Sequence, residues 1–479
     1  RDSRGARDSD SAGESGKRPD ADSEVGVKPD AGNSGSETSE VDVTGGHDLT
    51  SRLTLETPAA GEAQTADVVC ESDSTLVQLV NKIIVDAMES GASDIHIEST
   101  SSNRPTRIRM RRDGLLSDYA EIPARFRAVM VSRIKVMASL DIAEHRKHQD
   151  GKIDFSRFGA AKLELRVAII PTTNGLESVI LRLLASTTPL PVEKLCLDSR
   201  VLEQLRQVVE KPHGLLLVCG PTGSGKTTTL HSLISLINTP ERKIWTAEDP
   251  IEITQDGLSQ VQVNAKIGWT FVEALRSLLR ADPDVIMIGE IRDRETAQTA
   301  VEASLTGHLV FSTLHTNSAP ETVARLLDLG VDSFKFGDSL LGVLAQRLVR
   351  RVCPACVKPV ALGDEDAARL AREYAADGSL EPSIILADWR ERLGRKGQLF
   401  TAHGSGCDGC GGTGFKGRLG LHEFMAVSAP LRKLVHRRDE PEAVRERALS
   451  EGMRTLRQDG IEKALMGLTT IQQVRAACG

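Results

Sequence analysis

An eight-residue segment with the make-up of a phosphate-binding loop lies near the middle of the chain. Residues 220–227 read Gly-Pro-Thr-Gly-Ser-Gly-Lys-Thr and match the pattern G-x-x-x-x-G-K-[ST] at every fixed position. Glycines let such a backbone fold tightly, so that its N–H groups point at phosphate oxygens. Lys226 supplies a positive charge, and the Thr227 hydroxyl can ligate Mg²⁺. The residues expected to contact a nucleotide are Gly220, Pro221, Thr222, Gly223, Ser224, Gly225, Lys226, Thr227 and Thr228.

The flanks of this segment favour a functional loop over an accidental glycine-rich turn. An apolar run at 214–219 (GLLLVC) precedes it, and a helix-forming run that opens at Thr227 follows it. Phosphate-binding loops need this strand–loop–helix context, because the positive end of the helix dipole then points at the phosphates. The sequence therefore predicts a Mg²⁺-dependent P-loop ATPase.

Acidic residues follow two further apolar runs. Glu290 comes directly after the run VIMIG, where it could lie near Mg²⁺ or its water shell. Glu248 and Asp249 end the run IWTAED, and Glu252 follows closely. A carboxylate there could orient the attacking water. One acid after a strand is more often a helix cap, but two after adjacent strands of a P-loop fold favour catalysis.

Two C-x-x-C pairs stand apart from the phosphate chemistry. Cys353 and Cys356 form the first pair, and Cys407 and Cys410 form the second, 50 residues further on. Four thiolates suit a tetrahedral Zn²⁺ ion, and a closed four-sulfur shell would be structural rather than catalytic. Reduced cysteines or redox pairs are the alternatives. The cysteines expected to pack or remain free are Cys70, Cys196, Cys219 and Cys478.

The elements that must position these residues can be read from apolar periodicity. From about residue 198, apolar runs alternate with helical patterns, which indicates a mostly parallel sheet with crossover helices. The strand candidates are 214–219, 243–247, 285–288 and 309–313. Residues 72–190 read instead as a small α+β domain. Its signals are apolar residues at helical spacing from Leu76 to Ala87, alternation at 93–98 and 106–112, and an Asp113–Gly114 turn.

Charge and composition exclude several classes of function. Residues 1–65 contain 14 acidic and 7 basic residues, which accounts for the whole net charge of −7 and leaves 53 of each sign elsewhere. Residues 1–66 also have few large apolar side chains, so we expect a disordered acidic tail. A neutral remainder and 3% aromatic residues argue against a nucleic-acid binder. No run approaches the ~18–20 apolar residues of a membrane span, and no secretory signal is evident, so we expect a cytoplasmic protein.

Longer motifs resemble one family. The segment from Leu275 to Asn317 (LRSLLRADPDVIMIGEIRDRETAQTAVEASLTGHLVFSTLHTN) resembles the secretion ATPases of type II secretion and type IV pilus assembly machines. TAEDPIE at 246–252 is similar to their acidic box, and TGHLVFSTLHTN at 306–317 to their histidine box. SDIHIE at 93–98 and RIRMRRDG at 107–114 resemble their second N-terminal domain. The resemblance covers roughly residues 72–479 and includes a tetracysteine element.

This resemblance implies a RecA-like motor domain, a preceding α+β domain, and a ring hexamer with ATP between the two domains. By position, Lys226 and Thr227 would bind nucleotide, Glu248 would be the general base, and Glu290 the Walker B acid. His308 and His315 would sense the γ-phosphate. The arginines that would close on the phosphates are Arg276, Arg280 and Arg292 in the motor domain and Arg166 and Arg182 in the N-terminal domain.

The chain departs from the family pattern at a few positions. His148 stands where the family usually has Pro, Ala168 replaces a common Ser, and GLE at 175–177 inserts one residue between Arg166 and Arg182. The family's first N-terminal domain, which docks on a membrane-anchored partner, is not expected. The expected division is 1–66 acidic tail, 67–190 α+β domain, 191–350 RecA-like ATPase domain, 351–420 zinc-binding tetracysteine subdomain and 421–479 helical C-terminal subdomain.

The sequence thus predicts a motor that hydrolyses ATP to drive type II secretion or type IV pilus assembly. Its expected cofactors are ATP, Mg²⁺ and Zn²⁺. Its expected partners are further copies of itself in a homohexamer and the inner-membrane platform and docking proteins of the machine, with no direct nucleic acid. Two rival functions remain, a RecA-like nucleic-acid translocase and a non-hydrolysing scaffold. A retraction motor is disfavoured, because those relatives resemble the chain less and lack the four cysteines.

Overall fold

A computed structural model describes residues 66–100, 103–184, 188–378 and 380–479 of the chain. The predicted acidic tail, apart from Ala66, lies outside the described residues. Among the helices of the described part, none is both long enough and apolar enough to cross a bilayer.

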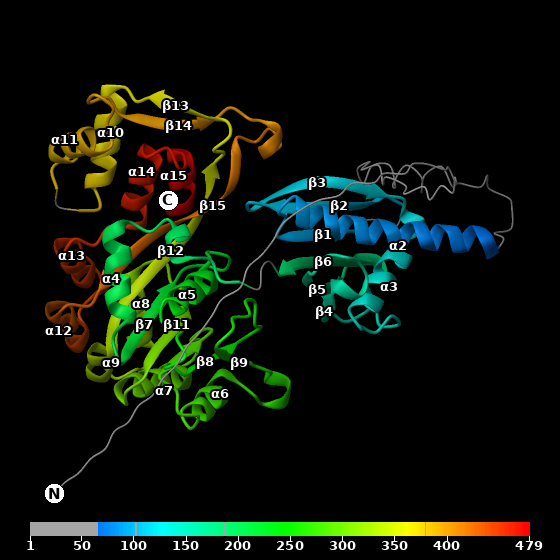
Figure 1. Ribbon diagram of the computed structural model, residues 1–479, viewed down its shortest axis with the longest axis horizontal. Helices are drawn as coiled ribbons and strands as arrows, with labels where there is room; N and C mark the ends of the chain where they lie inside the picture. The colour runs from blue at the N-terminus through cyan, green and yellow to red at the C-terminus, as the bar shows by residue number, and fades with distance from the viewer. Residues whose placement is uncertain (1–65, 101–102, 185–187, 379) are drawn as a thin grey trace, which may run out of the picture. The chain divides into compact units, whose positions relative to one another are not determined.

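The first part of the described chain is an antiparallel sheet covered by two helices (Figure 1). Its six strands run in the order β3-β2-β1-β6-β5-β4. Their bounds are β1 Asp94–Glu98, β2 Thr106–Arg112, β3 Leu115–Ile122, β4 Gln149–Asp154, β5 Glu164–Pro171 and β6 Glu177–Leu184. Helices α2 (Ala66–Glu89) and α3 (Arg127–Met137) share one apolar core with alternate strand residues, which leaves the other alternate residues on the opposite face.

The predicted local signals of this part are confirmed. The apolar residues predicted at helical spacing lie in α2 and are buried; they are Leu76, Leu79, Val80, Ile83, Ile84 and Ala87. Thr106–Arg112 is β2, and Asp113 and Gly114 both have positive φ in the turn that leads to β3. An α+β fold is therefore what these patterns specify.

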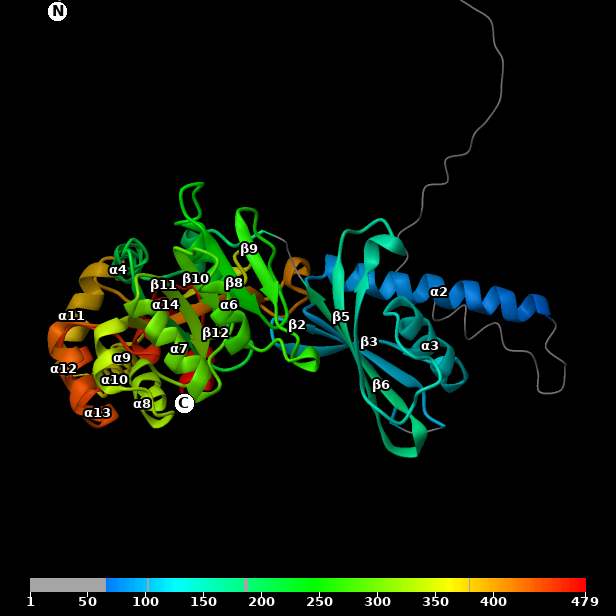
Figure 2. The same ribbon diagram turned by 90° about the horizontal axis from the view of Figure 1, so that it is seen from below.

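The second part is built on a seven-stranded sheet with the order β15-β12-β7-β11-β10-β8-β9. Its strands are parallel except β15, which runs antiparallel to β12. Figure 2 shows β9 beside β8 at one edge. The bounds are β7 Gly214–Cys219, β8 Ile244–Glu248, β9 Leu258–Gln262, β10 Val285–Ile288, β11 Leu309–Leu314, β12 Leu340–Val352 and β15 Phe415–Ala426. The four predicted strands are confirmed as β7, β8, β10 and β11.

Helices cover both faces of this sheet, which explains why its central strands are buried at every position and mostly apolar. In β7, Leu216 and Val218 pack in the core that contains α4 and α5, whereas Leu215 and Leu217 pack in the core on the other face. The helices are α4 Ser199–Val209, α5 Lys226–Ser235, α6 Phe271–Leu278, α7 Arg294–Leu305, α8 Ala319–Asp328 and α9 Ser333–Ser339.

The 50 residues between the cysteine pairs form a small lobe of their own. Strands β13 (Val357–Ala361) and β14 (Phe400–Gly404) pair antiparallel, and α10 (Asp364–Ala375) and α11 (Pro382–Arg392) lie between them in sequence. Buried Trp389 meets Tyr374 edge-on at 5.2 Å and joins the two helices. The remaining helices are α12 Ala429–Arg437, α13 Pro441–Ser450, α14 Leu456–Leu465 and α15 Ile471–Cys478.

Two of the expected domain limits fall inside strands. The limit at residue 350 cuts β12, and the limit at residue 420 cuts β15. Because β12 pairs with β7 and β15 pairs with β12, both belong to the sheet that holds the phosphate loop. The short 3₁₀ helices of the described chain are Ala124–Phe126, Phe155–Arg157, Thr173–Gly175, Val192–Leu195, Ala265–Ile267 and Asp408–Cys410.

Candidate functional site

The glycine-rich segment forms the connection between β7 and α5, as its pattern predicts. Gly220, Gly223 and Gly225 all have positive φ, at 149°, 78° and 85°. A Cβ atom on Gly220 would lie 2.4 Å from the backbone oxygen of Gln346, so this glycine is also needed for a close approach. The helix begins at Lys226, so its free N–H groups face the loop.

The Lys226 side chain folds back onto the backbone of the phosphate loop. Its Nζ donates to the backbone oxygens of Gly220 at 2.8 Å and Pro221 at 3.1 Å. Burial lowers the pKa of this ammonium, and the charge of Glu290 opposes that shift. The ammonium is thus held beside the loop backbone and within electrostatic reach of the predicted metal-binding acid.

Gln346 is a residue of this site that the motif search missed. It lies buried on β12, where its Nε2 donates to the backbone oxygen of Ser224 at 2.7 Å and its Oε1 accepts from the Thr229 hydroxyl at 2.7 Å. One side chain therefore joins the loop to the first turns of α5. A polar residue inside the apolar run LLGVLAQRLV was the available signal.

Glu290 and His315 meet at the carboxyl ends of neighbouring strands. Glu290 follows β10, His315 follows β11, and His315 Nε2 lies 3.2 Å from Glu290 Oε2. Arg292 forms an ion pair with the other oxygen of Glu290. His308 instead precedes β11, so it lies at the amino ends of the strands, and its Nδ1 contacts the backbone oxygen of Ala303. Within one chain, the structure brings His315 but not His308 to this end of the sheet.

Glu248 is fully engaged by its neighbours and buried, with only 2% of the residue exposed. Its Oε1 accepts from the Thr246 hydroxyl at 2.6 Å and from Gln260 Nε2 at 2.9 Å. Its Oε2 lies 3.3 Å from Nε2 of His231, which is also buried. Carboxylate oxygens offer about four acceptor positions, so three partners leave little capacity for water.

Glu252 has the opposite surroundings. It lies in the exposed connection between β8 and β9. Burial lowers the pKa of Lys226, and the negative charges of Glu290 and Glu252 oppose that shift. Of the two glutamates at positions 248 and 252, Glu252 is thus the exposed one, in the connection that follows β8, and Glu248 is the enclosed one at the end of β8.

The motor-domain arginines lie on exposed surfaces. Arg276 on α6 pairs with Glu273 at 2.8 Å and also with Glu295. These contacts raise the pKa of Arg276, the Glu295 bond most. Arg280 follows α6 and is exposed. None of them donates to a backbone group of the phosphate loop in the described bonds.

Arg166 and Arg182 are placed side by side in the six-stranded sheet. They are direct cross-strand partners on β5 and β6. The extra residue between them falls in the connection after Pro171, so it does not shift their pairing. Arg182 Nε donates to Asp94 at 2.9 Å, and no acid pairs with Arg166 within the described part of the chain. Like charges directly opposite each other are unfavourable unless an anion lies between them.

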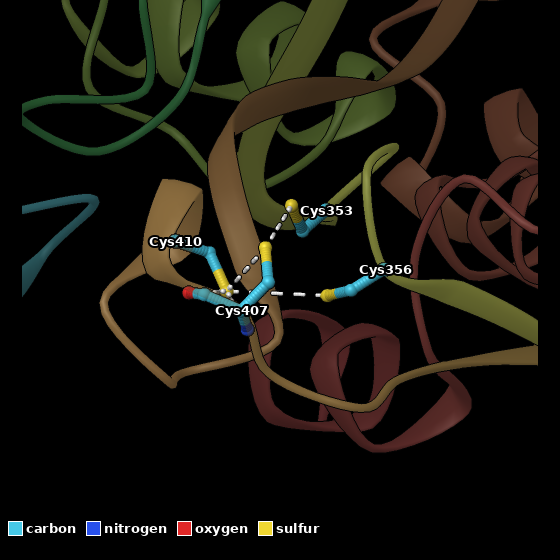
Figure 3. Close-up of side chains that lie close together, drawn as sticks. All are labelled: Cys353, Cys356, Cys407 and Cys410. Carbon is cyan, nitrogen blue, oxygen red and sulfur yellow. Dashed lines mark hydrogen bonds between the residues drawn. The ribbon is translucent and has the colours of Figure 1, made fainter.

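The four paired cysteines converge on one point (Figure 3). Their sulfurs all lie within 4.8 Å of one another, with Cys353 to Cys407 and Cys356 to Cys410 both at 3.9 Å. Burial opposes ionisation of Cys410, but N–H groups of Cys407 and Gly414 donate to its sulfur and lower its pKa to about 6. Such a cluster could hold a metal ion.

Among the side chains that the structure describes, the remaining cysteines form no comparable group. Cys219 is buried beside the phosphate loop, and burial raises the pKa of its thiol to about 11. Cys196 and Cys478 are half-buried and unpaired with other sulfurs among the described residues. The side chain of Cys70 lies outside the described residues.

Comparison with known proteins agrees with the motifs. The sequence profile of the family described as Type II/IV secretion system protein matches residues 69–476. Type II secretion system protein E of Dickeya dadantii (strain 3937) is 43% identical over 405 residues, which are 84% of this chain and 76% of that protein. Type IV pilus assembly ATPase PilB of Myxococcus xanthus (strain DK1622) is 43% identical over 403 residues, which cover 84% of this chain and 68% of that one.

A solved structure shows the same fold. The crystal structure of the pilus retraction motor PilT with bound ADP superimposes with a TM-score of 0.53 and 25% identity. The match covers 83% of this chain and 96% of that chain.

The Gln346 contacts can be tested by substitution. In Gln346→Met, the Ser224 oxygen and the Thr229 hydroxyl lose a buried partner, and each unsatisfied group costs about 1–3 kcal/mol. We expect a lower free energy of unfolding and weaker nucleotide binding, measured by denaturant titration and by titration with a fluorescent nucleotide. Unchanged binding would show that the loop keeps its shape without Gln346. Lys358→Met, on exposed β13, is the matched control.

Proposed function

The chain belongs to the Type II/IV secretion system protein family, and from this we infer that it is the ATP-hydrolysing motor of a type II secretion or type IV pilus assembly machine. It is a P-loop ATPase with a RecA-like fold. The observation that carries the proposal is the placement of Lys226, His315 and Glu290 beyond the carboxyl ends of the neighbouring parallel strands β7, β11 and β10, with His315 and Glu290 in contact.

The nucleotide and its metal would be held by residues at the carboxyl ends of the strands. The loop N–H groups and Lys226 would bind the β- and γ-phosphates, and Thr227 and Glu290 would hold Mg²⁺ directly or through water. The donor set fits, because a hydroxyl and a carboxylate near the phosphate lysine are oxygen ligands of the kind Mg²⁺ prefers. When bound, Mg²⁺ would neutralise charge on the phosphates. His315, which contacts Glu290, would sense the γ-phosphate; this role is not extended to His308.

The general base is assigned to Glu252 in place of Glu248. A base must accept a proton from water, which requires a carboxylate with free acceptor positions in reach of the phosphates. Glu252 is exposed and contributes its charge at Lys226, whereas Glu248 uses its oxygens on Thr246, Gln260 and His231. The position match that selected Glu248 could not distinguish two acids four residues apart.

Arg166 and Arg182 would complete the site from the α+β domain. Their direct pairing creates a concentration of positive charge for which no acid compensates at Arg166 in the described chain. A phosphate anion would supply that compensation. In a hexamer, one subunit's arginines could close on its own or a neighbour's nucleotide, and the exposed Arg276, Arg280 and Arg292 could join them.

The partners and the place in the cell follow from this role. A homohexamer would act at the cytoplasmic side of the inner membrane and contact the platform and docking proteins of the machine. The division into a tail, an α+β domain, a motor domain, a zinc subdomain and a helical end stays a proposal, with β12 and β15 shared between the last three. A translocase of nucleic acid is less favoured, because the chain outside the tail carries equal numbers of both charges.

The cysteine cluster would bind one Zn²⁺ ion. Zinc–sulfur bonds of ~2.3 Å in a tetrahedron place sulfurs about 3.8 Å apart. The sulfur distances of 3.9, 3.9 and 3.7 Å agree with that geometry. The ion would stabilise the base of the lobe and would not touch the nucleotide.

Paired substitutions test the choice of base. We expect Glu252→Gln to keep nucleotide affinity while its hydrolysis rate falls by roughly 10²-fold or more, the scale of a lost general base. In Glu248→Gln the hydrolysis rate should fall less. This variant should also have a lower thermal stability, because the substitution alters a buried hydrogen-bond network. Phosphate release and fluorescent-nucleotide titration measure the two properties. The reverse ranking of the two rates would return the base to Glu248.

The arginine pair is tested by its effect on stimulated turnover. Arginines that stabilise the transferred phosphoryl group are worth roughly 10³–10⁵ in rate. We expect Arg166→Ala to remove most of the rise in turnover that accompanies hexamer formation, with nucleotide affinity nearly unchanged. Arg157→Ala, on the same domain and exposed, is the control. Stimulation of the native chain by DNA alone at physiological salt would favour the nucleic-acid motor instead.

Metal content tests the cysteine cluster. We expect about one zinc per chain in protein purified without chelators, since four thiolates fill one shell. Cys407→Ser should lower the metal content and the stability of the lobe while leaving the catalytic rate close to native. Elemental analysis measures the first and thermal unfolding the second. Cys196→Ser is the control, and metal-free native protein would contradict the assignment.

A further inference from the structure

A cluster of polar side chains joins the helix after the phosphate loop to the connection between β8 and β9. Its centre, His231 and Glu248, is buried, whereas Gln255 and Gln260 are half-buried and Ser235 is exposed. Its members are His231 and Ser235 on α5, Glu248 at the end of β8, Gln255 in the connection and Gln260 on β9. The His231 side chain is 0% exposed and the Glu248 side chain 3% exposed. Burying polar groups such as these two is unfavourable in free energy unless each one has a hydrogen-bond partner. Their contacts therefore constrain the position of the segments that carry them.

The contact between His231 and Glu248 requires a shared proton. Nε2 of His231 and Oε2 of Glu248 lie 3.3 Å apart. An ionised carboxylate has only acceptor positions, so the proton must lie on the ring nitrogen or on the carboxyl group. Either arrangement ties the two side chains together, because separating them would leave a buried polar group unpaired.

The other side of the ring holds the connection. His231 Nδ1 lies 3.2 Å from Gln255 Oε1, and Gln255 Nε2 donates to the Ser235 hydroxyl at 2.9 Å. Gln255 thus contacts α5 through both ends of its amide. Its backbone N–H donates to Gln260 Oε1 at 2.9 Å.

The Gln260 side chain also bonds to the backbone of the connection and to β8. Its Nε2 donates to the backbone oxygen of Ile253 at 2.8 Å as well as to Glu248. Asn238, beyond the end of α5, donates to the backbone oxygen of Asp256 at 2.8 Å. The connection is therefore fixed at Ile253, Gln255 and Asp256, immediately after the exposed Glu252.

We propose that His231, paired with Glu248, is a positioning residue for ATP hydrolysis that fixes the β8–β9 connection against the phosphate-loop helix and so places Glu252. The inference rests on the proposed function, because it assumes that Glu252 activates water. His231 itself touches neither nucleotide nor water in this scheme. It acts through the β8–β9 connection, because Glu252 lies near the start of that connection.

The physical reason for an effect on rate is geometric. The nucleotide is held at the start of α5, and the base is held on the connection, so the distance between them depends on how firmly the two segments are joined. A misplacement of about 1 Å in a reacting group can lower a rate by roughly 10²-fold. Nucleotide binding depends on the loop itself and should change little.

Two measurements on the full-length chain test this proposal. Hydrogen–deuterium exchange of the peptide that spans residues 249–262 reports how firmly the connection is held, without nucleotide and without any need for activity. Steady-state hydrolysis gives KM and kcat separately. The variants are His231→Phe, which keeps a ring but no polar atom, and His231→Gln, which keeps a donor toward Glu248. A third, Gln255→Leu, removes the side-chain contacts of the connection with His231 and Ser235 and leaves the contact between His231 and Glu248. Leu236→Ala, exposed on the turn after α5, is the control.

We expect His231→Phe to speed exchange of the 249–262 peptide and to lower kcat by roughly 10²-fold with KM within about threefold of native. His231→Gln should recover part of both effects, and Gln255→Leu should show the same pattern more weakly. In the double variant His231→Phe with Glu248→Gln, the loss should not exceed that of the worse single variant, because the two residues act through one contact.

Unchanged exchange in both His231→Phe and Gln255→Leu would overturn the proposal, and so would faster exchange with an unchanged kcat. If His231→Phe does not fold, the half-buried Gln255→Leu and the donor-keeping His231→Gln still decide between these outcomes. If the native chain hydrolysed no ATP, the proposed function would fail, while the exchange result would still show whether His231 holds the connection.

Discussion

The motor part of this protein depends on one constraint: a short backbone segment must keep its N–H groups free for phosphate oxygens while it is surrounded by packed secondary structure. Elsewhere in a buried core, unpaired N–H groups would be costly. Here the fold keeps them available by occupying the other side of the loop. Gln346 takes the Ser224 oxygen, Lys226 takes the oxygens of Gly220 and Pro221, and the positive φ values of three glycines allow the tight path.

That constraint also explains which parts of the fold were predictable from the sequence. Strands β7, β8, β10 and β11 are largely buried on both faces, so they are mostly apolar runs between turn residues, and their limits were found to within one residue. Strands β12 and β15 were not identified. Their runs contain arginines, glycines and a glutamine whose roles depend on partners far away in sequence. Pairing between residues 340–352 and 415–426 leaves no local periodic signal, so domain limits were placed inside both strands.

The site divides in the same way. Spacing within a short motif predicted the phosphate loop and the four cysteines, because those chemistries fix which residue types stand at which interval. Glu290 was predicted from its place directly after an apolar run. Spacing could not assign roles to Glu248 and Glu252, since both fit an acidic box and only burial separates them. Nor could it find His231, whose importance arises from contacts with β8 and the β8–β9 connection. For Arg166 and Arg182, the resemblance named the residues, and the strand register shows that the extra residue between them leaves them paired.

The lobe between the cysteine pairs has a consequence for the conformational entropy that the chain loses when the two pairs come together. Bringing two ends of a flexible 50-residue segment together has an unfavourable free energy that grows with the logarithm of its length. In this chain the antiparallel pairing of β13 with β14 meets that requirement, since Val357, one residue after Cys356, pairs with Gly404, three residues before Cys407. The buried contact of Trp389 with Tyr374 orders the interior of the segment. That strand pairing therefore places the two ends of the segment, and with them the two cysteine pairs, next to each other.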